Sequence, residues 1–466
     1  MKSSEISAAE TPDKRRKLLI VTLIFLTALG VRLLNWQSHH HEALAVQSSV
    51  ALNYKHQARL IQANGVASLA NTSSTTNNPD LLGHPPGYPI LLSLIYRVAG
   101  ESDTATQLLQ LVLDSLSVVI IVLIAFEFFP TTVGLMAGFM SAFAPQFSWN
   151  SLTLLPDSLA ALPILLAVLI ITRAFWRPNR SDRSSALSIL AAGALIGISC
   201  WLRANALLLA PFLALVLFFV GKRSARLRIA LVLVCGALLM ISPLTIRNLS
   251  VFGKFIPVSL GAGQTLIEGI ADYNTDGSLG LPQTDVELIR GEAEAYHRPD
   301  YAGSLFTPDG PERDRARLAR GLAVIRAQPF WFAGVMIRRA ASMLRLERTP
   351  LRLPSTTSHT LLQWPLRIVQ KLFITAIFLP LVLLGAGILI YRRQVQRLAI
   401  LLVIPGYYFS TQSALHTEYR YVLVIHYFLF VLAAVGVYSI ICQMNRRFTR
   451  LNPAPSLGDP VLEAEL

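Results

Sequence analysis

Long apolar segments alternate with short polar or basic ones along most of this 466-residue chain. A helix that crosses a hydrocarbon core of about 30 Å needs roughly 20 apolar residues. Segments near that length predict an all-α polytopic membrane protein with about ten transmembrane helices. These segments are Leu18–Leu34, Ala105–Phe129, Thr131–Trp149, Leu159–Trp176, Ala186–Leu202, Ala204–Val220, Ile229–Ile246, Leu366–Tyr391, Leu398–Ser413 and Val422–Cys442.

The short segments between these runs indicate the orientation of the chain. Five of them are basic: Lys14–Lys17, Arg177–Arg183, Lys222–Arg228, Arg392–Arg397 and Arg446–Arg450. With ten spans, all five fall on one side of the membrane. Short basic loops are retained in the cytoplasm, so we predict that this side is cytoplasmic, together with both termini.

Two long polar segments then lie on the opposite side. The predicted division is a cytoplasmic tail (1–17), a membrane module (18–246) with a first outer loop (35–104), a large outer loop (247–365), C-terminal spans (366–442) and a second tail (443–466). Pro89–Gly100 and Phe330–Leu346 are apolar but too short or too charged to span. We therefore predict amphipathic surface helices there, with a re-entrant or packed core helix as the alternative.

Composition changes this picture only by excluding other classes of protein. The chain is 53% hydrophobic and 15% charged, whereas soluble domains carry about 25% charged residues. Its net charge of +14 would suggest nucleic-acid binding in a soluble protein, but the basic residues cluster at the ends of apolar runs, as topology signals do. The three cysteines show no CxxC spacing, which argues against a cysteine metal site.

Two carboxylates stand at predicted membrane boundaries. Asp157 follows Pro156 at the outer end of the fourth span, where a carboxylate is often functional. It could equally be the first-turn residue of a helix. Glu42 follows the run His39–His41 just beyond the first span. Consecutive histidines point in different directions, which is poor metal-ligand spacing, so an unstructured histidine-rich loop is the simpler expectation.

Several basic side chains could bind a phosphate. His84 is the first residue of the stretch His-Pro-Pro-Gly-Tyr-Pro. The prolines and the glycine predict a rigid turn, which either has only a structural role or holds His84 at the level of the lipid headgroups. Arg203, Arg247 and Arg420 lie at outer ends of spans, against the usual charge bias. Arginine offers a fixed fork of donors for phosphate, although a side chain at a span end can also simply extend towards water.

The order of these spans, outer loops and motifs along the chain resembles that of the GT-C superfamily of membrane glycosyltransferases, in the branch of protein mannosyltransferases and lipid A aminoarabinose transferase. His84–Leu92 matches a His-Pro-Pro-like stretch that opens a helix in the family's first outer loop, and Leu155–Ser158 supplies the acidic residue of the next one. Ile241–Asn248 with Phe252–Ser259 is similar to the start of the large loop, and Ala323–Arg339 to its later amphipathic segment. The family's usual Asp after the first span is replaced here by His41-Glu42.

The resemblance implies transfer of a sugar from a polyprenyl-phosphate donor to a lipid, glycan or protein acceptor at the outer face of a bacterial plasma membrane. Glu42 or Asp157 would be the catalytic base, and His84, Arg203, Arg247 and Arg420 would surround the donor phosphate. The resemblance implies no specific cofactor, although a divalent metal ion could supply charge stabilisation. The alternatives are a non-enzymatic lipid or polysaccharide exporter, an inactive relative, and a polysaccharide polymerase or ligase.

Overall fold

The computed structural model describes residues 14–70, 80–176, 182–220, 226–347 and 363–451, and within these ranges the regular structure is helical. Six helices are long and apolar enough to cross a membrane: α1 (Lys14–Ala45), α6 (Asp103–Phe128), α9 (Asp157–Trp176), α10 (Asp182–Leu202), α12 (Arg226–Phe252) and α20 (Leu423–Leu451). A seventh span results if α17 (Gln363–Lys371) and α18 (Thr375–Tyr391), bent by 62°, count as one. The predicted all-α polytopic membrane fold is confirmed.

The other three predicted spans are shorter helices. They are α7 (Thr131–Phe143), α11 (Leu209–Val220) and α19 (Val395–Thr411), of 13, 12 and 17 residues. The run predicted as Thr131–Trp149 is divided because Pro145 begins a separate helix, α8 (Pro145–Leu152). A 12-residue helix is only about 18 Å long at 1.5 Å per residue. These helices pack laterally in the bundle, with α7 against α1, α6 and α20, and α11 against α12 and α19.

A buried polar network joins three of the long helices. Arg32 on α1 donates from Nε to Asp114 Oδ2 on α6 at 2.6 Å, and Tyr427 on α20 donates from its hydroxyl to Asp114 Oδ1 at 3.2 Å. Arg32 and Asp114 are almost wholly buried. Because a charge inside the bundle is tolerated only when it is paired, the network restricts α1, α6 and α20 to one mutual arrangement.

The connection between α1 and α6 is helical. It contains α2 (Ser48–Asn64), η1 (Val66–Ala70), α4 (Asp80–Gly83) and α5 (Gly87–Ala99). The predicted surface helix is α5, which buries Tyr88 and Leu92 but leaves the apolar side chain of Val98 90% exposed. The expected unstructured histidine-rich loop is wrong, because α1 meets no helix breaker before Ala45 and includes the histidines.

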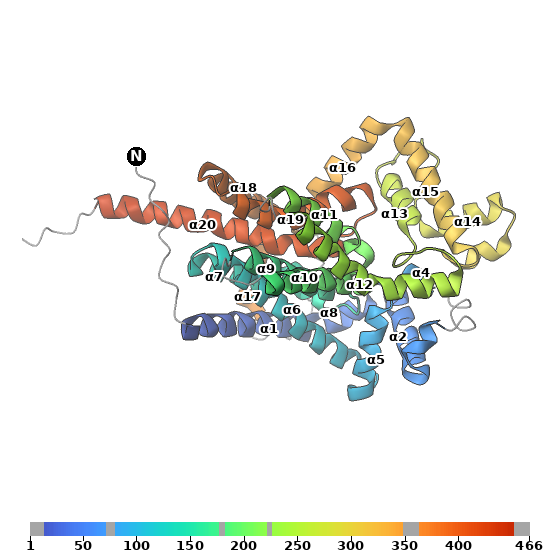
Figure 1. Ribbon diagram of the computed structural model, residues 1–466, viewed down its shortest axis with the longest axis horizontal. Helices are drawn as coiled ribbons and strands as arrows, with labels where there is room; N and C mark the ends of the chain where they lie inside the picture. The colour runs from blue at the N-terminus through green and yellow to red at the C-terminus, as the bar shows by residue number, and fades with distance from the viewer. Residues whose placement is uncertain (1–13, 71–79, 177–181, 221–225, 348–362, 452–466) are drawn as a thin grey trace, which may run out of the picture.

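A second helical group follows α12, and we call residues 262–343 the loop subdomain. It contains α13 (Ala262–Ala271), α14 (Asp285–Ala295), η3 (Pro299–Gly303), α15 (Gly310–Ala327) and α16 (Pro329–Met343). Figure 1 shows it projecting from the same end of the bundle as α2 and α5, which we call the loop end. The second predicted surface helix is α16, on which Phe330 is 91% exposed.

After α19 the chain passes through η4 (Gln412–Ala414) and η5 (Tyr419–Val422) before it enters α20. The first of these short helices packs against α16, and the second against α9. The segment that connects α19 to α20 therefore touches both the loop subdomain and the membrane bundle.

Candidate functional site

The first feature of the loop end is a two-pronged ion pair. Asp157 begins α9, and Arg203 directly follows α10. Arg203 donates from Nε to Asp157 Oδ1 at 2.7 Å and from Nη2 to Oδ2 at 2.9 Å. Burial by itself lowers the pKa of Arg203, but the neighbouring charge of Asp157 raises that pKa above its ordinary value. Asp157 is thus both the first-turn residue of its helix and the partner of an arginine whose side chain is 15% exposed.

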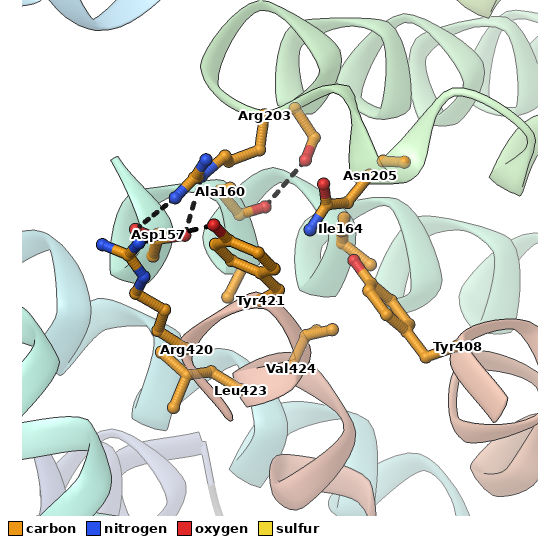
Figure 2. A pocket seen from close by; sticks show the side chains of 13 residues that line it. Asp157, Ala160, Ile164, Arg203, Asn205, Tyr408, Arg420, Tyr421, Leu423 and Val424 are labelled. Carbon is orange, nitrogen blue, oxygen red and sulfur yellow. Dashed lines mark hydrogen bonds and ion pairs between the residues drawn. The ribbon is translucent and has the colours of Figure 1, made fainter. Parts of the chain in front are cut away.

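A second arginine reaches the same place from the other side of the cavity (Figure 2). Arg420, on η5, is 6% exposed and donates from Nη2 to Glu418 Oε1 at 2.7 Å. Its Nε and Nη1 have no hydrogen-bond partner among the described residues. A cavity opens beside these groups. It is lined by Asp157, Arg203 and Arg420 and also by Asn205, Tyr408 and Tyr421. Arg203 thus pairs with Asp157 and Arg420 with Glu418, and the two nitrogen donors of Arg420 that remain without a partner among the described residues favour a further anion.

Aromatic and imidazole groups from the first connection lie beside this cavity. The ring of Tyr54 on α2 is 5.3 Å from that of His84 and 5.2 Å from that of Tyr88. Burial raises the pKa of Tyr54 to about 12, and the charges of Arg203, Asp157 and Arg420 also act on it. The buried Tyr54 hydroxyl has no partner among the described residues. It is therefore a third donor, besides Arg420 Nε and Nη1, that has no partner among the described residues in this part of the loop end.

His84 is neutral at this site. Burial, followed by the charge of Arg203, lowers the pKa of His84 to about 4. At neutral pH its imidazole can donate or accept one hydrogen bond, but it brings no positive charge. The positive charge near Asp157 therefore comes from the arginines, and His84 can only complement them as a neutral group.

Gly87 explains how His84, which does not itself line the cavity, comes close to it. A Cβ at Gly87 would lie 2.5 Å from the carbonyl oxygen of Trp201, near the end of α10. Only glycine permits this approach of α5 to α10. The contact brings the His-Pro-Pro turn close to Arg203, which follows Trp201 by two residues. A rigid turn in this stretch and a position of His84 near the site are therefore compatible with each other.

Glu42 and Arg247 do not line this cavity. The Glu42 side chain is 57% exposed and lies 3.3 Å from His39 Nδ1. The next residue, Ala43, belongs to a buried apolar cluster near the end of α1. Tyr419, the residue before Arg420, packs against this cluster, so the end of α1 lies next to η5. Arg247 donates from Nε to the carbonyl oxygen of Leu69 at 2.8 Å, which ties α12 to η1.

Some residues of the site were missed in the sequence. Glu418 and Tyr421 flank Arg420 in the run Glu-Tyr-Arg-Tyr, and that cluster of charged and aromatic residues before the last apolar run is a usable signal. Tyr54 lies in an ordinary amphipathic helix, and nothing in the sequence around it signals a functional role. In the ranges that the structure describes, no three His, Cys, Asp or Glu side chains are grouped so that they could hold a metal ion.

Comparison with known proteins supports the resemblance seen in the sequence. Residues 83–246 match the family of dolichyl-phosphate-mannose-protein mannosyltransferases. This stretch contains His84, Asp157 and Arg203. None of the curated protein sequences matches the chain.

Solved structures show the same fold. The oligosaccharyltransferase AglB from Archaeoglobus fulgidus, in complex with an inhibitory peptide and a dolichol-phosphate, aligns over 96% of this chain and 52% of its own, with 17% identity and a TM-score of 0.52. The apo form of the Archaeoglobus fulgidus oligosaccharyltransferase gives a TM-score of 0.54, with 15% identity over 94% of this chain and 52% of its own. The chain thus spans about half the length of these relatives. The protein is a multi-pass membrane protein that shares the fold of the Archaeoglobus fulgidus oligosaccharyltransferase, and its residues 83–246 match the family of dolichyl-phosphate-mannose-protein mannosyltransferases.

Proposed function

We propose that this protein transfers a sugar from a polyprenyl-phosphate donor to a lipid, glycan or protein acceptor at the outer face of the membrane. The observation that carries the proposal is Arg420, a buried arginine beside Asp157 and Arg203 whose Nε and Nη1 have no hydrogen-bond partner among the described residues. A phosphate is the natural ligand for such unsatisfied charged donors. AglB, whose fold this chain shares, has been solved with a dolichol-phosphate.

In the proposed reaction an acceptor hydroxyl attacks the anomeric carbon of the donor sugar. The bond from that carbon to the phosphate oxygen breaks, and the polyprenyl phosphate leaves as an anion. The hydroxyl proton passes to a carboxylate acting as general base. Negative charge grows on the leaving oxygen, where Arg420 and the hydroxyl of Tyr54 would stabilise it. Asp157 would hold Arg203 in place beside them.

The two candidate carboxylates, Asp157 and Glu42, differ in how many hydrogen bonds their oxygens already accept. Both oxygens of Asp157 already accept N–H groups from Arg203, so the carboxylate is committed to that ion pair. Glu42 is largely exposed, and its one described polar contact is with His39. We therefore assign the base to Glu42 and a positioning role to Asp157.

The cavity as described is too small for a phosphate group. Its volume is about 20 Å³, room for about one water molecule. Donor binding would therefore require the side chains around it to move apart.

Charges inside the bundle favour surface chemistry over transport. A transporter typically binds its substrate near the membrane midplane through polar groups. Asp114 pairs with Arg32 at 2.6 Å, and Glu127 pairs with Arg173 at 2.8 Å. Both carboxylates are therefore engaged within the protein, whereas at the loop end two nitrogen donors of Arg420 have no hydrogen-bond partner among the described residues.

The proposed activity can be tested by mass spectrometry of membrane lipids and surface glycans. Cells lacking the gene should lose a sugar from one lipid, glycan or protein, and should accumulate the corresponding polyprenyl-phosphate sugar. Complementation with the wild-type gene should reverse both changes. Unchanged sugars together with a lipid retained in the inner leaflet would contradict the proposal and support an exporter.

The proposed orientation predicts a labelling pattern in intact cells. In a cysteine-free background, single cysteines at His56 and Ala302, which are exposed at the loop end, should react with a membrane-impermeant maleimide. A cysteine at Gln396, which is exposed in the first turn of α19 within the basic segment Arg392–Arg397, should react only after lysis. The reverse pattern would place the site in the cytoplasm and would contradict the proposed location.

A further inference from the structure

The segment 412–418, which we call the connector, joins α19 to the helix that carries Arg420. The loop subdomain contacts it closely through α13. The connector residue His416 donates its backbone N–H to the carbonyl oxygen of Thr265 at 2.7 Å. Its Nδ1 lies 2.9 Å from Asp272 Oδ2. A Cβ placed on Gly269 would lie 2.5 Å from the backbone nitrogen of His416, so α13 and the connector are in direct backbone contact there.

A buried arginine reinforces this contact from α16. Arg339 is 3% exposed and donates from Nη1 to the carbonyl oxygen of Ser413 at 2.9 Å. Its Nη2 donates to the carbonyl oxygen of Gly269. One guanidinium group therefore bonds both to α13 and to the connector. The loss of that group would leave buried carbonyl groups unsatisfied, so the junction is held firmly.

The connector leads directly to the site. Thr417 donates from its hydroxyl to the carbonyl oxygen of Gln412 at 2.6 Å, which closes the connector on itself. The next residue, Glu418, accepts the N–H of Arg420 Nη2 at 2.7 Å. Only three residues separate His416 from Arg420, so a shift of the connector would displace the guanidinium group of Arg420.

We propose that the loop subdomain positions Arg420 by clamping the connector through Gly269 and Arg339, and thereby sets the affinity of the site for the phosphate of the donor. This inference rests on the proposed function, because it assigns Arg420 to the donor phosphate. Gly269 and Arg339 are positioning residues that act through Arg420. Holding a binding group in place before the ligand arrives reduces the entropy lost on binding.

The test compares two glycine substitutions in the loop subdomain. Gly269→Ala inserts a methyl group against the connector, whereas at Gly334 on α16 a Cβ would meet no atom within 4 Å. With undecaprenyl phosphate as the probe, Gly269→Ala should weaken binding to the purified full-length protein about tenfold, the effect of roughly one hydrogen bond. Gly334→Ala should bind as the wild type does. Hydrogen exchange at the His416 amide should accelerate only in Gly269→Ala.

A second pair of variants distinguishes loss of the clamp from a general loss of folding. Arg339→Met removes both hydrogen bonds of the guanidinium group and should weaken probe binding, while Arg339→Lys should recover part of it. Equal probe binding by Gly269→Ala and Gly334→Ala, or by Arg339→Met and the wild type, would overturn the clamp. A wild-type protein that binds no undecaprenyl phosphate would instead overturn the proposed function, so the two failures are distinguishable.

Discussion

Glu42→Gln should lower the turnover of sugar transfer by about 10²–10⁴-fold, the usual contribution of a general base. The substitution keeps the shape of the side chain but removes its ability to take the proton of the acceptor hydroxyl. Glu42 is exposed and has little to do with packing, so the amount of folded protein should not change. The measurement is the rate of transfer under saturating donor, together with the apparent affinity for the donor.

The matched controls are Glu101→Gln and Asp157→Asn. Glu101 is another carboxylate of the first connection, in an exposed ion pair with Arg59, and its substitution should leave turnover unchanged. Asp157→Asn weakens the hold on Arg203 and should chiefly reduce donor affinity. If Glu42→Gln retains wild-type turnover and Asp157→Asn loses it, the base is Asp157 and the roles proposed here are exchanged.

Arg420→Gln should lower kcat/KM for the donor by about 10²–10³-fold, as removal of a preorganised donor of charge stabilisation does. The loss has two parts, because Arg420 would bind the phosphate in the ground state and stabilise the leaving group as its charge increases. Arg420→Lys keeps a positive charge but not the planar fork, and it should restore only part of the loss. Steady-state kinetics with a purified polyprenyl-phosphate sugar measures both parameters.

Arg298→Gln is the appropriate comparison for Arg420. Arg298 is also an arginine of the loop end, but it is 43% exposed and pairs with Asp300. Exposed ion pairs of this kind contribute little, so this variant should behave as the wild type does. Equal kinetics for Arg420→Gln and Arg298→Gln would remove Arg420 from the site and with it the main support for a phosphate-bound donor.

The sequence by itself determined the class of fold and most of the chemical groups. Apolar segments of sufficient length are local features, and they predict the long helices because no other arrangement satisfies the backbone inside lipid. Local signals likewise identified Asp157, Arg203 and Arg420, each as a charged residue at the end of an apolar run. Local patterns were less reliable where a helix stops, as at Pro145 within a predicted span, and beyond Leu34, where α1 continues to Ala45.

Only the tertiary structure decided which of these groups meet. Asp157 and Arg203 lie 46 residues apart in the chain, and they pair because α9 packs against α10. The sequence predicts Arg247 at the same phosphate; in the folded chain its Nε bonds the carbonyl oxygen of Leu69, and it does not line the cavity of Asp157 and Arg420. His84 carries no charge at neutral pH because burial, which no single segment reveals, lowers its pKa. Charge and hydrophobicity are properties of residues, whereas pairing and desolvation depend on the packing of distant helices, which only the folded chain determines.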